Sequence, residues 1–221
     1  MNQLLTLEQA RERLLSAMLQ QEQAGMTSAP LRPDGDSDHW QEASRQLTDE
    51  GLAVPGSVTG TWNLTAAGRV AAIEHLIAAL TDRKELPMHM LAEKVHRHGE
   101  AVAKLDAPAE PDLNGIGDAQ ITALNRLAVA PLYSGVSQSA WNLRGNRSSS
   151  NRVLRSLLER NLVEKVPVVG GSGWHWQLTA LGRVAVAQLG CLQAQKLVDL
   201  YDEEISQARL LLTDAVAALR A

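Results

Sequence analysis

The stretch that decides the fold is residues 157–184, LLERNLVEKVPVVGGSGWHWQLTALGRV. Two runs rich in apolar residues flank a Gly-rich turn, a pattern typical of a β-hairpin. Residues 47–70 read LTDEGLAVPGSVTGTWNLTAAGRV and repeat the pattern at an offset of 110 before the hairpin and 114 after it. The identical pairs are Leu47/Leu157, Leu52/Leu162, Trp62/Trp176, Leu64/Leu178, Thr65/Thr179, Ala66/Ala180, Gly68/Gly182, Arg69/Arg183 and Val70/Val184. Self-similarity at half the chain length predicts a tandem duplication.

A heptad pattern follows each hairpin. In the second copy, apolar residues recur at spacings of three and four from Val184 to Leu219, which predicts one long helix with a coiled-coil seam. The first copy has the corresponding pattern from Val70 to Leu105, but it contains Pro87. Proline lacks an N–H and clashes with the preceding turn. We therefore expect the first helix to break or kink there, and a second segment that begins at the proline to cover residues 87–105.

The two copies are joined by residues 106–118, DAPAEPDLNGIGD, whose Pro, Gly and Asp content predicts a linker. The expected domains are therefore residues 1–105 and residues 119–221. Periodicity in the second copy predicts helices over 118–129, 136–143 and 149–161, then strands over 162–169 and 174–178. In the first copy it predicts a helix over 6–23 with a capping box from Thr6 to Gln9, a helix over 37–50 and a short hairpin. No second helix is recognisable in residues 28–38, SAPLRPDGDSD.

The segment NRVLRSLLERNLVEK, the hairpin VPVVGGSGWHWQLT and the exit LTALGR resemble bacterial winged helix-turn-helix regulators, notably the MarR-like and PadR-like groups. The resemblance covers about residues 119–220, with a weaker echo across 5–105. It implies a mainly α fold with small β-hairpin wings (α+β), in which each tandem winged-helix domain precedes a long helix. The first domain is then a degenerate, acidic copy.

Charge separates the two copies. The whole chain has a net charge of −4 and a pI near 5.9, which argues against nucleic-acid binding. Residues 119–190, however, hold eight basic and two acidic residues, whereas residues 1–80 hold five basic and ten acidic ones. Because phosphate attracts Lys and Arg, we expect only the second copy to meet DNA.

In the family that the chain resembles, the third helix enters the major groove and the wing lies near the adjacent backbone. Arg and Asn suit base edges, and Ser residues at a helix start suit a phosphate. The alternative is an ordinary ion pair of Arg155 with Glu159. Another is that His175 is simply exposed on its strand, while Trp174 and Trp176 pack in the core. The candidate DNA contacts are Arg144, Arg147, Ser148, Ser149, Ser150, Asn151, Arg152, Arg155, Lys165 and His175.

The last helix is the expected dimerisation element. Its candidate contacts are Val198, Tyr201, Ile205, Ala208, Leu212 and Leu219. We favour a C2 homodimer with two basic reading heads, and the alternative is pairing of the two heptad helices within one chain. One cysteine, no apolar run of about 20 residues and no signal peptide predict a cytoplasmic protein without membrane contact.

The sequence therefore predicts a transcriptional regulator that binds double-stranded DNA sequence-specifically through the second winged helix, with no cofactor. It has no phosphate loop, nucleophile elbow or paired catalytic carboxylates in context, so we expect no enzyme. His89, Glu93 and His96 share a helix face, but a solvated face is favoured over a metal site. The alternative function is a structural adaptor of an SMC/condensin-like (MukE-like) complex, with its protein partner on the acidic first domain. No effector pocket can be identified from the sequence.

Overall fold

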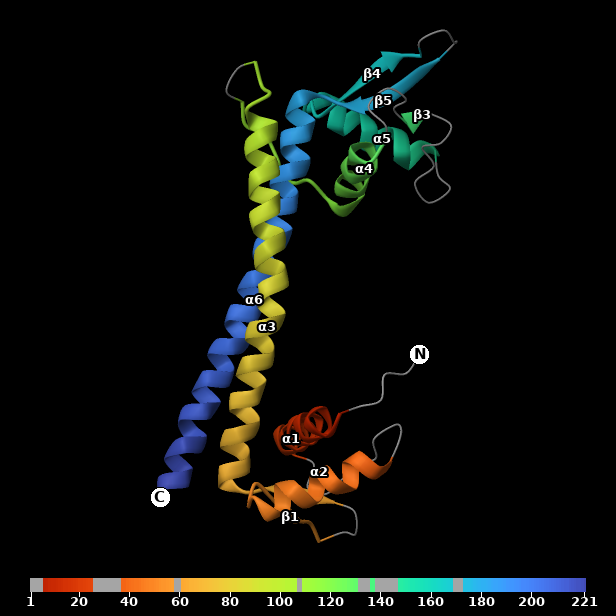
Figure 1. Ribbon diagram of the computed structural model, residues 1–221. Coiled ribbons are helices and arrows are strands. Elements are labelled where there is room, and N and C mark those ends of the chain that lie inside the picture. Colours follow the sequence, from red (N-terminus) through yellow and green to blue (C-terminus); the bar gives the residue numbers. More distant parts are fainter. Residues whose placement is uncertain are drawn as a thin grey trace. The chain divides into compact units, whose positions relative to one another are not determined.

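The computed structural model describes residues 6–25, 37–57, 61–106, 109–130, 136–137, 147–168 and 173–221. This part is mainly helical with two small antiparallel sheets, which confirms a mainly α chain with small hairpins (Figure 1). The helices are α1 (Leu7–Gln23), α2 (Ser37–Asp49), α3 (Ala66–Val102), α4 (Asp118–Ala128), α5 (Arg147–Glu159) and α6 (Ala180–Arg220). The strands are β1 (Ala53–Pro55), β2 (Trp62–Leu64), β3 (Val136–Ser137), β4 (Val163–Pro167) and β5 (Trp174–Leu178). None of the described helices combines the length and apolarity that a bilayer crossing needs.

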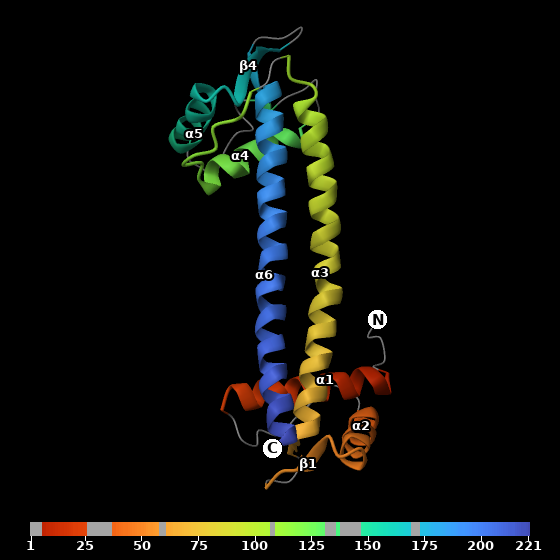
Figure 2. The same cartoon turned by 90° about the vertical axis from the view of Figure 1, so that its left-hand side faces the viewer.

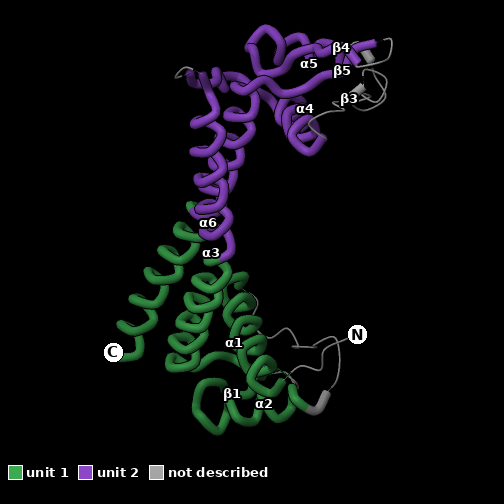
Figure 3. The backbone as a smooth tube through the Cα atoms, turned by 45° about the horizontal axis from the view of Figure 1, so that its top comes forward, with its two compact units in different colours: residues 1–85, 199–221 green, residues 86–198 purple. Residues whose placement is uncertain are grey.

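The chain divides into two compact units, coloured separately in Figure 3. Unit 1 comprises residues 1–85 and 199–221, and unit 2 comprises residues 86–198. Both long helices contribute to both units. This division follows contacts in space, so the domain boundaries proposed from the duplication remain a prediction.

Within each unit a segment of α3 lies beside a segment of α6, and the two run in opposite directions (Figures 1 and 2). In unit 1, Lys84 Nζ lies 2.5 Å from Asp202 Oδ1. In unit 2, the side chain of Lys94 packs directly over Gly190. The heptad pattern predicted from the sequence therefore forms a helix pair inside the chain.

This pairing changes the interpretation of the dimerisation residues. Val198, Ile205 and Ala208 are buried within the chain, while Tyr201 and Leu212 are half-buried. In unit 1 the α6 seam joins one core with α1 and α3, so within the chain these seam residues are already covered. Among the six predicted residues, only Leu219 is exposed, at 49%. An apolar seam predicts that one face of a helix is buried. In unit 1 this face of α6 is buried by residues of the same chain, in α1 and α3.

The expected break at Pro87 is wrong, because α3 is one helix from Ala66 to Val102 with Pro87 inside it. Pro87 is buried on the seam. A proline in a helix interior removes one backbone hydrogen bond and costs about 3 kcal/mol or more. The helix is held on both sides of that position by packing on α6, through Lys84 in unit 1 and Lys94 in unit 2.

In unit 1, α1 begins with the predicted capping box. The Thr6 hydroxyl accepts from the Gln9 N–H at 3.2 Å, and the Gln9 side chain accepts from the Thr6 N–H at 3.1 Å. The buried face of α1 packs with Leu47 of α2 and Ile73 of α3. The hairpin pairs β1 with β2, with Ala53 opposite Leu64 and Pro55 opposite Trp62.

In unit 2, helices α4 and α5 and the start of α6 pack with a three-stranded sheet of order β3–β5–β4. Strand β5 pairs along one edge with β4 and along the other with β3, where Val136 lies opposite Trp176. The helix predicted over 136–143 is therefore wrong at Val136 and Ser137, and its other residues lie outside the described part. The physical reason is that β3 satisfies backbone groups of β5 that a lone hairpin would leave unpaired.

The duplicated LT-x-x-GR motif builds the same corner twice. Thr65 Oγ1 accepts from the Gly68 N–H at 2.9 Å and donates to the Gly51 carbonyl at 2.7 Å. In the second copy, Thr179 Oγ1 accepts from the Gly182 N–H at 2.9 Å and donates to the Asn161 carbonyl at 2.6 Å. Threonine thus caps the long helix and fastens it to the end of the preceding one.

The two residues whose carbonyl groups accept these hydroxyls occupy equivalent positions in the two copies. Gly51 (φ 71°) and Asn161 (φ 57°) both adopt the left-handed conformation that ends a helix. Glycine and asparagine are the residues that tolerate it best. The two copies therefore share geometry at a corner where their sequences differ.

Candidate nucleic-acid interface

Helix α5 has one buried face and one face exposed to solvent. Leu154 and Leu157 are fully buried against α4 and the sheet. Asn151, Arg152 and Arg155 are exposed on the opposite face. This is the 3.6-residue periodicity of an amphipathic helix, and it directs both arginines to solvent.

Two polar contacts fix the position of α5. The Gln120 side-chain amide of α4 donates to Ser156 Oγ at 3.0 Å. Beyond the end of α5, Arg160 donates to the Asp112 carbonyl at 3.0 Å and to its carboxylate at 3.3 Å. Residues 112–116 of the predicted linker are thus bound to the core of unit 2, on which Leu113 and Ile116 also pack.

Arg152 and Arg155 have no ion pair with any residue that the structure describes. In particular, the alternative pair of Arg155 with Glu159 does not form. Neighbouring Arg160 shows the contrast, because Asp112 partly neutralises it. Two uncompensated guanidinium groups, one turn apart, are therefore available for an anion.

The equivalent helix of the first copy has a different surface. Arg45 of α2 pairs with Glu42 at 2.9 Å, and Gln46 donates to the same carboxylate at 3.0 Å. These hydrogen bonds, that of Arg45 first, lower the pKa of Glu42. Arg11 of α1 pairs with Glu50 at 2.5 Å. Arg11 and Arg45 are therefore compensated, and neither offers an unpaired guanidinium group to a phosphate.

The hairpin of unit 2 carries one more exposed cation. Lys165 Nζ lies 4.9 Å from the centroid of the Trp176 ring, on the strand opposite. Trp176 is buried as expected, and its Nε1 has no hydrogen-bond partner among the described residues. The cation–π contact holds the ammonium group of Lys165 at the sheet face.

Two predicted contacts are not available on the surface. Ser150 is 1% exposed and His175 is 7% exposed, so neither can reach a nucleic-acid groove directly. Ser150 lies on the core-facing side of α5, one turn before Leu154. His175 lies on the central strand of the sheet, which has neighbours on both edges. Both alternatives considered for His175, phosphate contact and simple exposure, assumed a solvated side chain.

The remaining predicted residues are only partly described. Arg147, Ser148 and Ser149 lie in the first turn of α5, but their side chains are outside the described part, and Arg144 lies outside it altogether. Trp174 is 56% exposed beside the turn, so the favoured prediction of core packing is wrong and the alternative, partial exposure, is confirmed. The available signal was that Trp174, unlike Trp176, has no counterpart in the first copy.

The face with His89, Glu93 and His96 makes contacts along its own helix. Glu93 pairs with Arg97, and His96 Nε2 lies 3.6 Å from Glu100 Oε1. Among the described residues, no three His, Cys, Asp or Glu side chains gather as a metal site would require.

Cys191 lies half-buried on the α6 seam, where burial raises the pKa of its thiol and nearby Lys94 partly opposes the shift. Because the thiolate is the nucleophile, we expect Cys191 to react with iodoacetamide more slowly in the folded protein than in urea. The rate profile of the folded protein should be displaced to higher pH, and Lys94→Gln should slow the reaction further. Equal rates for folded and unfolded chains, measured by mass spectrometry, would contradict this prediction.

These observations define a candidate interface on unit 2. It is formed by the exposed face of α5, with Arg152 and Arg155, and by Lys165 of β4. No protein-family model, curated protein or solved structure matches this chain.

Proposed function

We propose that the protein binds double-stranded DNA through a winged helix in unit 2, as a transcriptional regulator without enzymatic activity. Helix α5 acts as the recognition helix and the β4–β5 hairpin as the wing. The order α4, β3, α5, β4, β5, α6 and the sheet order β3–β5–β4 support this proposal.

The observation that carries the proposal is the pair of exposed, uncompensated arginines on α5. Arg152 and Arg155 lie three residues apart on one helix face, so both guanidinium groups can address one groove. In the equivalent region of unit 1, Arg11 and Arg45 form ion pairs with glutamates. The contrast explains how a chain of net charge −4 can bind DNA through one of its two copies.

The α6 seam is occupied inside the chain, so the proposal does not depend on a homodimer. One chain carries one reading surface, which predicts an asymmetric contact with a single half-site.

The test is a fluorescence-anisotropy titration with a random-sequence duplex at about 50 and about 200 mM salt. We expect the double variant Arg152→Ala/Arg155→Ala to bind at least about 10-fold more weakly at the lower salt. Its log–log salt slope should be less steep by about 1 for each of the two arginines that contacts a phosphate.

The matched control is Arg83→Ala/Arg209→Ala, which removes the same charge from two exposed arginines on α3 and α6. If both double variants lose affinity equally, the effect is one of net charge, and α5 is not the reading helix. Absence of duplex binding by the unmodified protein would overturn the proposal.

A second candidate function is a protein-binding adaptor of an SMC/condensin-like complex. The observation that favours it is the α2 surface of unit 1, where Glu42 and Asp49 lie beside compensated arginines. Such a surface repels phosphate and suits a basic protein partner. Unaltered DNA binding after the α5 substitutions, or none at all, would favour this candidate.

A further inference from the structure

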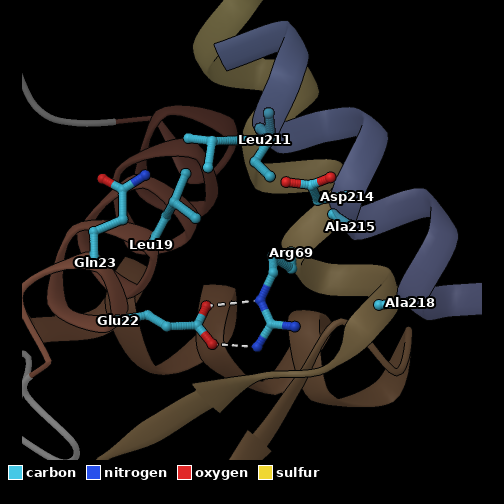
Figure 4. Close-up of a pocket in the computed structure, with 9 residues that line it drawn as sticks. Leu19, Glu22, Gln23, Arg69, Leu211, Asp214, Ala215 and Ala218 are labelled. Atoms are coloured by element: carbon cyan, nitrogen blue, oxygen red, sulfur yellow. Dashed lines mark hydrogen bonds and ion pairs between the residues drawn. The ribbon is translucent and has the colours of Figure 1, made fainter. Parts of the chain in front are cut away.

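We infer that unit 1 contains a binding site for a small amphipathic organic cation, an apolar molecule that carries one ammonium or amidinium group. The site is a cavity of about 350 Å³ between α1, the start of α3 and the end of α6 (Figure 4). This volume lies in the range of small-molecule sites, about 300–1,000 Å³. The inference is independent of DNA binding, because all lining residues belong to unit 1.

The body of the cavity is apolar. Leu19 of α1 and Leu211 of α6 face each other across it (Figure 4). Ile73 of α3, with Ala215 and Ala218 of α6, completes the apolar lining. The two alanines are short, so they leave open the space that longer seam residues would fill. An apolar ligand body would remove this lining from water, which favours binding.

The polar groups define the charge of the ligand. Arg69 Nε donates to Glu22 Oε2 at 2.9 Å, and its Nη2 makes a second bond to the other carboxylate oxygen. The Glu22 carboxylate, by accepting these bonds, raises the pKa of Arg69. This pair is bidentate and self-neutralising, so neither member needs a charge from a ligand.

Asp214 is different. It lines the cavity from α6, and it has no ion pair with any part of the chain that the structure describes. With Glu22 and Arg69 compensating each other, Asp214 gives the cavity a net charge of −1. A cation therefore complements the net charge of the site, whereas a carboxylate ligand would be repelled by Asp214 and could reach only the N–H groups of Arg69 that do not bind Glu22.

The test uses three probes of similar shape and different charge, namely 1-naphthylmethylammonium, 1-naphthalenemethanol and 1-naphthoate. Binding to the full chain is followed by isothermal titration calorimetry and by saturation-transfer NMR. We expect the ammonium probe to bind about 5-fold more tightly than the alcohol, as a solvent-accessible ion pair allows. The naphthoate should bind most weakly.

Three variants distinguish the site from surface adsorption. Asp214→Asn should abolish the preference for the ammonium probe and leave binding of the alcohol unchanged. Ala218→Leu fills the cavity from an exposed position, so it should abolish binding of all three probes while the circular dichroism spectrum stays unchanged. Glu204→Gln removes a carboxylate from the same helix outside the cavity, so it should change nothing.

The inference is overturned if none of the probes binds, if naphthoate binds as well as the ammonium probe, or if Ala218→Leu leaves binding intact. These outcomes are separate from the DNA proposal, because Arg152→Ala/Arg155→Ala should bind the ammonium probe like the unmodified protein.

Discussion

Alanine at Gly182 is expected to destabilise unit 2 by about 3 kcal/mol, the upper part of the range for overpacking a tight site. A Cβ at this position would overlap the backbone carbonyl oxygen of Leu162, which cannot rotate away as a side chain could. That oxygen also accepts the Thr179 N–H at 3.2 Å. The corner between α5, β4 and α6 must therefore open to admit a single methyl group.

Gly68→Ala should have the same effect in unit 1, because its Cβ would overlap the Leu52 carbonyl, which accepts the Thr65 N–H at 3.1 Å. The control is Gly99→Ala in α3, where a Cβ meets nothing within 4 Å. Loss of glycine flexibility in a helix should stabilise that variant by about 0.5–1 kcal/mol. Urea denaturation followed by circular dichroism measures all three, and equal midpoints for Gly182→Ala and Gly99→Ala would contradict the prediction.

Leu157→Ala is expected to cost about 2–5 kcal/mol of unfolding free energy, as large-to-small changes in a packed core do. Leu157 is fully buried in the core formed by α4, α5, the sheet and the start of α6. The aligned residue Leu47 is also fully buried, and Leu47→Ala should destabilise unit 1 to a similar degree.

The matched control is Leu158→Ala, one residue along the same helix, where the leucine is 42% exposed. Its cost should stay below about 1 kcal/mol, because only part of the side chain is removed from a packed environment. Tryptophan fluorescence in urea reports the difference. If the two variants unfold at the same concentration, α5 does not present the face described here.

Much of the local structure could be predicted from the sequence. The capping box at Thr6, the strand over residues 174–178 and the long helix that begins at Ala180 follow from residues close together in the chain. The duplication was readable because both copies need the same threonine and glycine at one corner. The contrast between Arg155 and the acidic first copy is also visible from composition alone.

The errors have one cause. A sequence pattern predicts whether a residue is buried or exposed, but it does not predict which residues lie beside it in the fold. Alternation grouped Trp174 with Trp176, but the sheet covers one and leaves the other 56% exposed. The same rule placed His175 on a surface strand, although β5 is the central strand. Val136 was assigned to a helix because its partner, Trp176, lies forty residues further along the chain.

The sequence by itself carried a repeat in two copies, an apolar heptad pattern after each hairpin, and an excess of basic residues in the second copy only. These properties depend on residue type and spacing, which the chain carries locally. Only the tertiary structure decided what covers each seam, that α3 continues through Pro87, and that Leu19, Arg69 and Asp214 line one cavity. Such facts depend on packing between residues far apart in the chain, where the free energy of burial outweighs local preference.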